Sequence, residues 1–341
     1  MKFRTVCRLL RRLLLAGLLL VFLAVNGAGF YIGNIIYTEM STRHSRLNSA
    51  NANAGRLKQR LEWGKRERQW QDVAIESRFG YRLQGTFIPN PQASTKTLVF
   101  LHGFTESRLV GLNYLNVYLN DGFNLLLIDS RHHGDSGGNS VTWGVYEKYD
   151  LDQWVDWLRK KYPAGLIGVH GISMGAATAL LHAELNEANR RVSFYVADSA
   201  YSDFEILLTQ QIRRHIPLPD YIQPEYLLPY ANIIAYWKSR FTFYQASPIR
   251  AVRQVTTPVL YIHGEADALV PAEMSQKLFA ETKGPKQIQL FPAADHVSAI
   301  YQDRYRYRNV IRDFAQANQE NLLRSRRVRL DNESPEVDSY L

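Results

Sequence analysis

The most constraining feature of this sequence is a series of short apolar runs that are separated by helical patterns. The runs are residues 97–101, 124–128, 166–169, 194–197 and 259–262, with a further candidate at 287–291. Each is shorter than a typical helix, and its continuous apolar character is typical of a strand that is buried on both faces. Strands that alternate with helices build a mostly parallel sheet covered on both faces. The sequence therefore predicts an α/β domain over residues 72–323, opened by a hairpin at 73–87.

One of these runs continues into a tight turn with the sequence VHGISMG at residues 169–175. A Gly-x-Ser-x-Gly sequence between a buried strand and an alanine-rich helical pattern predicts a sharp turn that exposes Ser173 as a nucleophile. Glycine is needed on either side because a side chain there would collide with neighbouring backbone. The same residues also fit a plain strand-to-helix connection in which Ser173 is the helix N-cap. Taken alone, this stretch leaves both interpretations open.

Polar side chains follow the ends of the predicted strands. The carboxyl ends of parallel strands meet at one edge of a sheet, where α/β proteins bind ligands. Ser173, Asp267 and His296 each follow a different strand, in the order nucleophile, acid and base. Asp198 also follows a strand and is a second candidate for the acid. We favour Asp267 because the surrounding segment, 263–271, fits the usual acid loop of such a site.

These residue types suit acyl transfer. A serine hydroxyl is a weak nucleophile at neutral pH, so a neutral imidazole must take its proton as it attacks a carbonyl carbon. A buried carboxylate holds that imidazole in the correct tautomer and stabilises its charged form. Backbone N–H groups then stabilise the oxyanion, and the loss of one such donor costs on the order of 3 kcal/mol.

Over residues 72–315 the chain resembles the α/β-hydrolase superfamily, and within it the serine hydrolases of the BEM46-like and serine-aminopeptidase-like groups. The resemblance rests on six motifs in the family's order: HGFTES, DSRHHGDSGG, GISMGAATAL, DSAY, HGEADALVP and ADHVSA. It implies an α/β-hydrolase fold with Ser173 as nucleophile, His296 as base and Asp267 as acid.

The resemblance also implies an oxyanion hole formed by the backbone N–H groups of Phe104 and Met174. The segment DSRHHGDS departs from the Arg-Gly-x-Gly that relatives commonly have, so the conformation of this loop is not implied. His132, His133 and Asp135 lie in the segment, but no further ligands follow at a recognised spacing. We therefore expect neither a metal nor an organic cofactor.

The stretch between Asp198 and Pro258 is far longer than one crossover helix requires. We expect a cap insertion at about residues 204–247, which its prolines divide into more than one helix. Its aromatic residues between Tyr226 and Tyr244 are expected to cover Ser173 and to favour an apolar acyl or leaving group. The expected reaction is hydrolysis of a small-molecule carboxylic ester through an acyl-enzyme. A peptidase or amidase, or an acyltransferase, would use the same residues, so these alternatives stay open.

The N-terminal region is expected to anchor the protein in the cell membrane. Residues 13–38 contain no charged side chain and, at about 1.5 Å per residue, are long enough to cross a bilayer. A cleaved signal peptide is the competing interpretation, but its apolar core is usually shorter and its cleavage site clearer. The basic segment 1–12 should stay cytoplasmic, which places the catalytic domain outside the cytoplasm. Basic residues at 43, 46, 56 and 58 weaken this asymmetry of charge.

The remaining segments are polar. Residues 39–71 are expected to form a stalk that is partly helical at 57–70, and residues 324–341 a mobile tail without an apolar period. The formal charge of +9 is concentrated near the N-terminus, where five basic side chains precede residue 13. Because no nucleic-acid-binding motif occurs in the core, no nucleic-acid partner is expected. The oligomeric state is not predicted.

Overall fold

The computed structural model describes residues 2–43, 52–215, 219 and 222–333. Its centre is an eight-stranded sheet in the order β1-β2-β4-β3-β5-β6-β7-β8. β1 pairs antiparallel with β2, and β2 with β4, whereas all other neighbours are parallel. The strands are β1 (Gln71–Glu76), β2 (Arg82–Ile88), β3 (Thr97–Leu101), β4 (Asn124–Ile128), β5 (Ile167–Ile172), β6 (Phe194–Asp198), β7 (Val259–Gly264) and β8 (Lys286–Phe291). The predicted mostly parallel sheet is confirmed.

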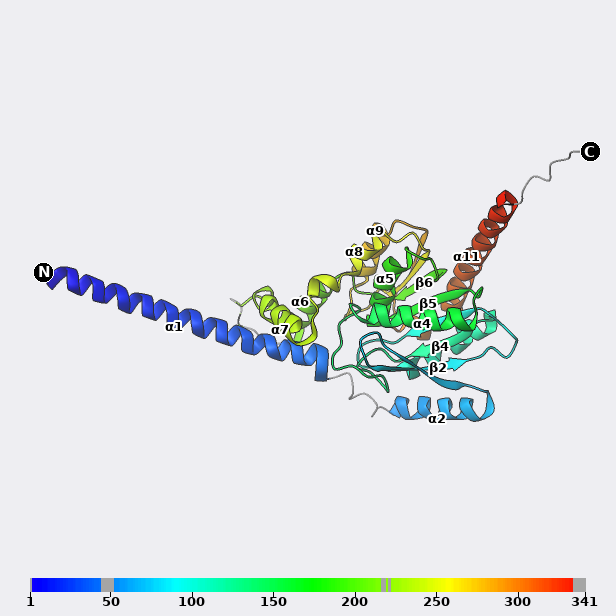
Figure 1. Ribbon diagram of the computed structural model, residues 1–341, viewed down its shortest axis with the longest axis horizontal. Helices are drawn as coiled ribbons and strands as arrows, with labels where there is room; N and C mark the ends of the chain where they lie inside the picture. Colours follow the sequence, from blue (N-terminus) through cyan, green and yellow to red (C-terminus); the bar gives the residue numbers. More distant parts are fainter. Residues whose placement is uncertain (1, 44–51, 216–218, 220–221, 334–341) are drawn as a thin grey trace, which may run out of the picture.

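Helices cover both faces of this sheet (Figure 1). On β3, Leu98 and Phe100 join the apolar core of one face, and Val99 and Leu101 join that of the other, because successive side chains alternate. The first core is closed by α2 (Ala52–Glu67), η3 (Arg108–Tyr114), α3 (Leu115–Tyr118), α10 (Ala299–Gln302) and α11 (Arg304–Glu333). The second is closed by α4 (Glu147–Lys161), α5 (Met174–Asn186), α8 (Pro248–Val252) and α9 (Ala272–Glu281). A short turn of 3-10 helix, η4 (Leu119–Asp121), precedes β4.

An insertion of helices lies between β6 and α8, where the sequence predicts a cap. It consists of α6 (Phe204–His215), η5 (Pro224–Tyr226), α7 (Leu228–Ser239) and η6 (Phe243–Gln245). Pro229 stands in the first turn of α7. Proline fits there because a backbone N–H group in the first turn has no intrahelical acceptor, so its absence costs no hydrogen bond. Residues 216–218 and 220–221 of this segment lie outside the described residues.

The N-terminal helix α1 (Lys2–Thr38) extends away from the domain, and its second half lies beside α7 (Figure 1). A π-helical turn, η1 (Glu39–Arg43), continues it. Ile36, Tyr37 and Met40 are buried in a third apolar cluster together with Phe204 of the cap and Met174 of α5. The end of the helix is therefore part of the domain's core, which the sequence does not predict.

Two polar segments differ from the expectation. The stalk contains α2, and Leu61 and Trp70 of this region are buried in the core of the sheet. The Nη1 group of Arg60 also donates to the carbonyl oxygen of Leu112 at 2.9 Å, so this part of the stalk is docked on the domain. At the other end, α11 continues to Glu333 where a mobile tail is predicted from residue 324; residues 334–341 lie outside the described residues.

Candidate active site

Ser173 occupies a strained turn between β5 and α5. Its backbone has φ 53° and ψ −118°, a left-handed conformation that non-glycine residues rarely adopt, and its side chain makes no N-cap hydrogen bond. The Ser173 N–H donates to the carbonyl oxygen of Asp198 on β6 at 2.8 Å. Ser173 thus stands at the N-cap position of α5 without capping the helix through its side chain, and this geometry favours the exposed-nucleophile interpretation.

The glycines on either side of Ser173 are required by close backbone contacts. A Cβ atom on Gly171 would overlap the carbonyl oxygen of Gly175. A Cβ atom on Gly175 would lie 2.5 Å from the carbonyl oxygen of Leu101, which is closer than real Cβ atoms approach a neighbour. Because these neighbours are backbone atoms, they cannot rotate away, and only glycine fits.

The structure brings Ser173, His296 and Asp267 together at the carboxyl edge of the sheet. The Oγ atom of Ser173 lies 2.9 Å from Nε2 of His296. On the other side of the ring, Nδ1 of His296 lies 2.7 Å from Oδ2 of Asp267. An ionised carboxylate can only accept hydrogen bonds, so Nδ1 carries the proton and Nε2 is free to accept from the serine hydroxyl. This is the tautomer that a general base requires.

Asp267 is held as a carboxylate by several donors. Burial by itself raises its pKa, but hydrogen bonds from His263 and His296, and from the backbone N–H of Val270, bring the pKa well below its ordinary value. Oδ1 accepts from the N–H groups of Leu269 and Val270 at 2.9 and 2.8 Å. The side chain of His296 is 19% exposed and that of Asp267 is fully covered, so only the base is open toward solvent.

His263 is a site residue that the sequence analysis does not predict as functional. Its Nε2 atom lies 3.1 Å from Oδ2 of Asp267 and 2.8 Å from the carbonyl oxygen of Val270. Since both partners are acceptors, Nε2 carries the proton, and Nδ1 accepts from the Ser275 hydroxyl at 2.6 Å. The sequence feature that points to His263 is its position near the end of β7, four residues before Asp267.

Asp198, the second candidate for the acid, takes other partners. Its carboxylate accepts from the hydroxyl groups of Tyr307 at 2.7 Å and Ser199 at 2.9 Å. Its backbone carbonyl holds Ser173 in the turn, as described above. Asp198 thus supports the turn, and the geometry favours Asp267 as the partner of His296.

The two candidate oxyanion donors lie on segments that meet at Ser173. Met174 is the first residue of α5, and Phe104 follows Gly103, whose Cβ position would be 3.4 Å from Cβ of Ser173. The loop is braced by Glu106, whose Oε2 accepts from the Gly103 N–H at 3.1 Å. Burial raises the pKa of the Glu106 carboxyl. Glu106 is a second residue near the site that the sequence analysis does not predict.

The residues considered for a metal take separate partners. The ring nitrogens of His132 lie near the carbonyl oxygens of Gly138 and Thr42, at 3.0 and 3.2 Å. His133 faces the carbonyl oxygen of Arg131, and Asp135 forms an ion pair with Arg108. Within the described ranges, no three His, Cys, Asp or Glu side chains are arranged to hold a metal ion.

The aromatic cap agrees with the prediction only in part. The ring of Phe104 lies 4.8 Å from that of Trp143, which lies 4.4 Å from that of Phe204 at the start of α6. These rings link the oxyanion loop to the cap, and Phe243 of the predicted stretch 226–244 continues the series, with its ring centre 5.3 Å from that of Phe204. Four other aromatic side chains of that stretch are at least half exposed: Tyr226 (65%), Tyr236 (50%), Trp237 (74%) and Tyr244 (64%).

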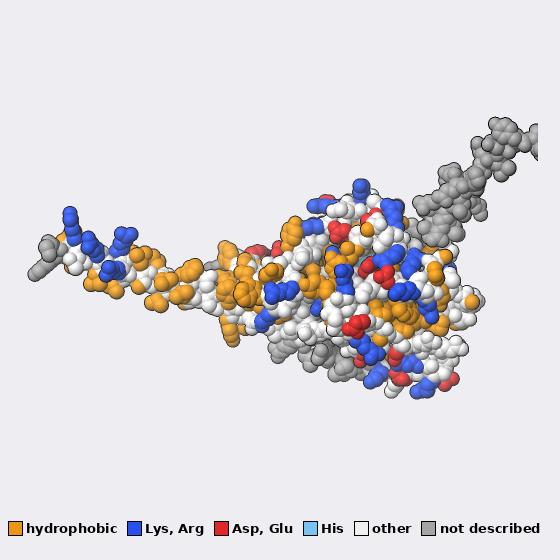
Figure 2. Space-filling model, in the orientation of Figure 1, with side chains coloured by type: hydrophobic (Ala, Val, Ile, Leu, Met, Phe, Trp, Pro, Cys, Tyr) orange, Lys and Arg blue, Asp and Glu red, His pale blue; other side chains and the backbone are white. Residues whose placement is uncertain are grey.

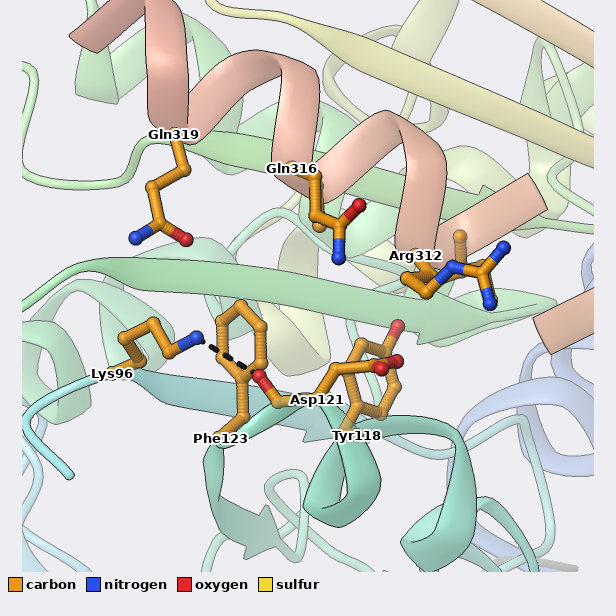
Figure 3. Close-up of a pocket in the computed structure, with 9 residues that line it drawn as sticks. Lys96, Tyr118, Asp121, Phe123, Arg312, Gln316 and Gln319 are labelled. Carbon is orange, nitrogen blue, oxygen red and sulfur yellow. Dashed lines mark hydrogen bonds between the residues drawn. The ribbon is translucent and has the colours of Figure 1, made fainter. Parts of the chain in front are cut away.

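A small cavity of about 80 Å³ lies far from this site (Figure 3). It lies between α11, near Arg312 and Gln316, and the segment around Lys96 and Phe123 at the amino ends of β3 and β4. On the side that faces α11, the Nζ group of Lys96 donates to the carbonyl oxygen of Asp121 at 2.9 Å. Because Ser173 stands at the opposite end of the strands, this cavity does not belong to the candidate active site.

The sheet order and the strand–serine–helix turn define the α/β-hydrolase class of folds. Comparisons with known proteins agree, since residues 96–221 match the alpha/beta hydrolase fold family. The chain is 33% identical over 241 residues to the uncharacterized protein YqkD of Bacillus subtilis, covering 70% of this chain and 77% of that protein. It is 27% identical over 256 residues to the uncharacterized protein YfhR of Escherichia coli K12, covering 72% and 80%. The chain belongs to the α/β-hydrolase family.

A solved structure is similar over the same region. The esterase Pf2001 of Pyrococcus furiosus matches with a TM-score of 0.59 at 26% identity, covering 73% of this chain and 92% of that one. This similarity supports a hydrolase function of the esterase type.

Proposed function

We propose that this protein is a single-pass membrane-anchored serine hydrolase that cleaves carboxylic esters through an acyl-enzyme at Ser173. The observation that carries the proposal is the hydrogen-bonded series from Ser173 through His296 to Asp267. The choice of an ester over an amide is supported by the similarity to the Pyrococcus esterase.

The geometry suggests the following sequence of steps. Ser173 attacks the ester carbonyl carbon while Nε2 of His296 takes its proton, and Asp267 stabilises the imidazolium that forms. The N–H groups of Phe104 and Met174 stabilise the oxyanion. His296 then gives the proton to the departing alcohol, which leaves an acyl group on Ser173. A water molecule, deprotonated by the same imidazole, releases the carboxylic acid and restores the serine.

The mechanism is tested by labelling with a fluorophosphonate probe, which reacts with an activated serine whatever the substrate. We expect the full-length protein and a Ser94→Ala control, far from the site, to be labelled, and Ser173→Ala to be unlabelled while it keeps its circular dichroism spectrum. Labelling of Ser173→Ala would contradict the assignment of Ser173 as the nucleophile. The substrate class is tested with p-nitrophenyl esters beside the matching anilides. A higher kcat/KM for anilides would favour an amidase.

The membrane part of the proposal is supported by α1. This helix is long and apolar enough to span a bilayer, by length and composition, and its most apolar window is almost wholly exposed. A basic segment before it favours a cytoplasmic N-terminus. The chain's single cysteine, Cys7, provides the test. In intact cells, we expect a membrane-impermeant maleimide to label the protein only after Tyr305→Cys is introduced. Labelling of Cys7 in intact cells would instead indicate that the N-terminus lies outside the cytoplasm.

A further inference from the structure

The part of α1 that is free of both charge and tertiary contacts is too short to cross a bilayer alone. Residues 13–25 are all exposed and uncharged. At about 1.5 Å per residue they span roughly 20 Å, whereas the hydrocarbon core is about 30 Å thick. If Arg11 and Arg12 extend toward the headgroups, the free stretch gains only about one turn, or roughly 5 Å. The remaining thickness must be crossed by residues after Val25, where α1 lies beside the cap.

Close packing holds the start of α7 against the part of α1 that follows Val25. A Cβ atom on Gly29 would lie 2.5 Å from the ring of Tyr230, and one on Gly33 would lie 2.8 Å from the backbone nitrogen of Ala231. Small residues at this four-residue spacing allow helices to approach closely in membranes. The hydroxyl group of Tyr230 also donates to Oδ1 of Asn26 at 3.1 Å. The beginning of α7 therefore lies beside residues 26–33 of α1, at the same position along the axis of that helix.

The end of α7 is tied further along α1 by polar contacts. The Nζ group of Lys238 donates to Oδ1 of Asn34 at 2.7 Å. The hydroxyl groups of Tyr37 and Ser239 are 2.5 Å apart, and Ser239 donates to Ser140 at 2.8 Å. The two helices thus run in the same direction, and the polar end of α7 lies on the side of the catalytic domain.

Large apolar and aromatic side chains are exposed on α1, α7 and the adjoining η5, and Figure 2 shows hydrophobic side chains continuing from α1 onto the adjoining part of the domain. They are Phe30 (43%), Tyr31 (70%), Tyr226 (65%), Ile233 (44%), Tyr236 (50%) and Trp237 (74%). Adjacent exposed apolar side chains mark a surface that contacts a partner. Tyrosine and tryptophan in particular are enriched where a protein meets the headgroup layer of a bilayer.

We propose that this surface, defined by these six side chains, lies in the interfacial layer of a phospholipid bilayer. The inference rests on the proposed anchoring by α1 and goes beyond it, because the cap helix α7, and not the anchor alone, contacts lipid. The length of the free stretch supports a bilayer as the occupant, and so does the continuity of the surface with α1.

The experiment uses full-length protein in phosphatidylcholine vesicles, in a Cys7→Ser background that accepts one environment-sensitive fluorophore. The labelled variants are Trp237→Cys on the proposed surface, Leu19→Cys in the free part of α1, and Tyr305→Cys on α11 as an exposed control. Quenching is measured with iodide in the water and with lipids that carry a nitroxide near the headgroup or deep in the acyl chain.

We expect the probe at position 237 to be quenched several-fold more strongly by the shallow nitroxide than the probe at 305, and to be protected from iodide. The probe at 19 should respond to the deep nitroxide. If the probe at position 19 responds in this way while the probe at 237 behaves like that at 305, α1 spans the membrane but the cap does not contact it. The proposed cap–lipid contact then fails, while the anchoring proposal stands. If none of the positions responds to lipid nitroxides, the anchoring proposal fails with it.

Discussion

Nε2 of His263 and Nδ1 of His296 both approach the same oxygen, Oδ2 of Asp267, at 3.1 and 2.7 Å. Two imidazoles therefore share one carboxylate oxygen, and the fully buried His263 positions Asp267 for His296, the base. We expect His263→Ala to lower kcat for ester hydrolysis, because a hydrogen bond to a charged group contributes about 1.5–3 kcal/mol. This corresponds to roughly ten- to a hundredfold in rate.

The control for this prediction is His263→Gln, whose side-chain amide can still donate to Asp267 and should recover part of the lost rate. KM should change little, since His263 does not face the substrate. If His263→Ala lost stability in thermal unfolding but kept the wild-type kcat, His263 would have a purely structural role.

Asp267 and Asp198 should respond differently to loss of charge. We expect Asp267→Asn to lower kcat by about ten-thousand-fold, because the amide favours the wrong tautomer of His296. Asp198→Asn should change kcat much less and mainly lower the melting temperature, since it disturbs the buried bonds to Tyr307 and Ser199. Steady-state kinetics and thermal unfolding of both variants provide the measurement, and the opposite ranking in kcat would transfer the acid role to Asp198.

The glycine contact between α1 and α7 can be tested with a matched pair of substitutions. Gly33→Leu places a side chain against the backbone of Ala231, and overpacking of this kind costs about 1–3 kcal/mol. Because Tyr37 and Met40 pack in the same cluster as Met174, we also expect lower esterase activity. A Cβ atom on Gly27, on the same helix, would meet nothing within 4 Å, so Gly27→Leu should leave both thermal stability and esterase activity unchanged. Equal effects of the two substitutions in thermal unfolding and turnover would argue against the docked helix pair.

Asp150 should make stability depend on pH. Burial raises the pKa of this carboxyl to about 6, although hydrogen bonds from Ser77 and Tyr81 act in the opposite direction. A folded-state pKa above the unfolded value of about 3.9 means that the stabilisation is complete below that value and is lost as pH rises through about 6.

Asp150→Asn removes this titration. Relative to the wild-type protein, the variant should therefore gain about 1–3 kcal/mol in free energy of unfolding between pH 4.5 and pH 8. Comparing the two proteins at both pH values cancels the constant effect of the altered hydrogen bonds. A difference between them that does not change with pH would contradict the raised pKa.

The fold was largely predictable because its determinants are local. The apolar runs at 97–101 and 124–128 form strands of the expected length, since burial on both faces requires continuous apolar residues. The turn at Ser173 was also predictable, because the Gly-x-Ser-x-Gly pattern between an apolar run and a helical pattern is contained in one short segment. The order of Ser173, Asp267 and His296 is likewise contained in the chain.

The tertiary structure decided what depends on contacts between distant segments. Asp198 and Asp267 both follow strands, and only the positions of Tyr307 and His296 distinguish their roles. His263 looks like a turn residue until its partners are known.

The N-terminal segments illustrate the same limit. In the sequence, residues 13–38 form one apolar run, yet its first half is free and its second half packs against α7, some two hundred residues away. The polar character of α2 likewise concealed the burial of Leu61 and Trp70. Sequence patterns record which side chains avoid water, and only the folded chain determines whether protein or lipid replaces that water.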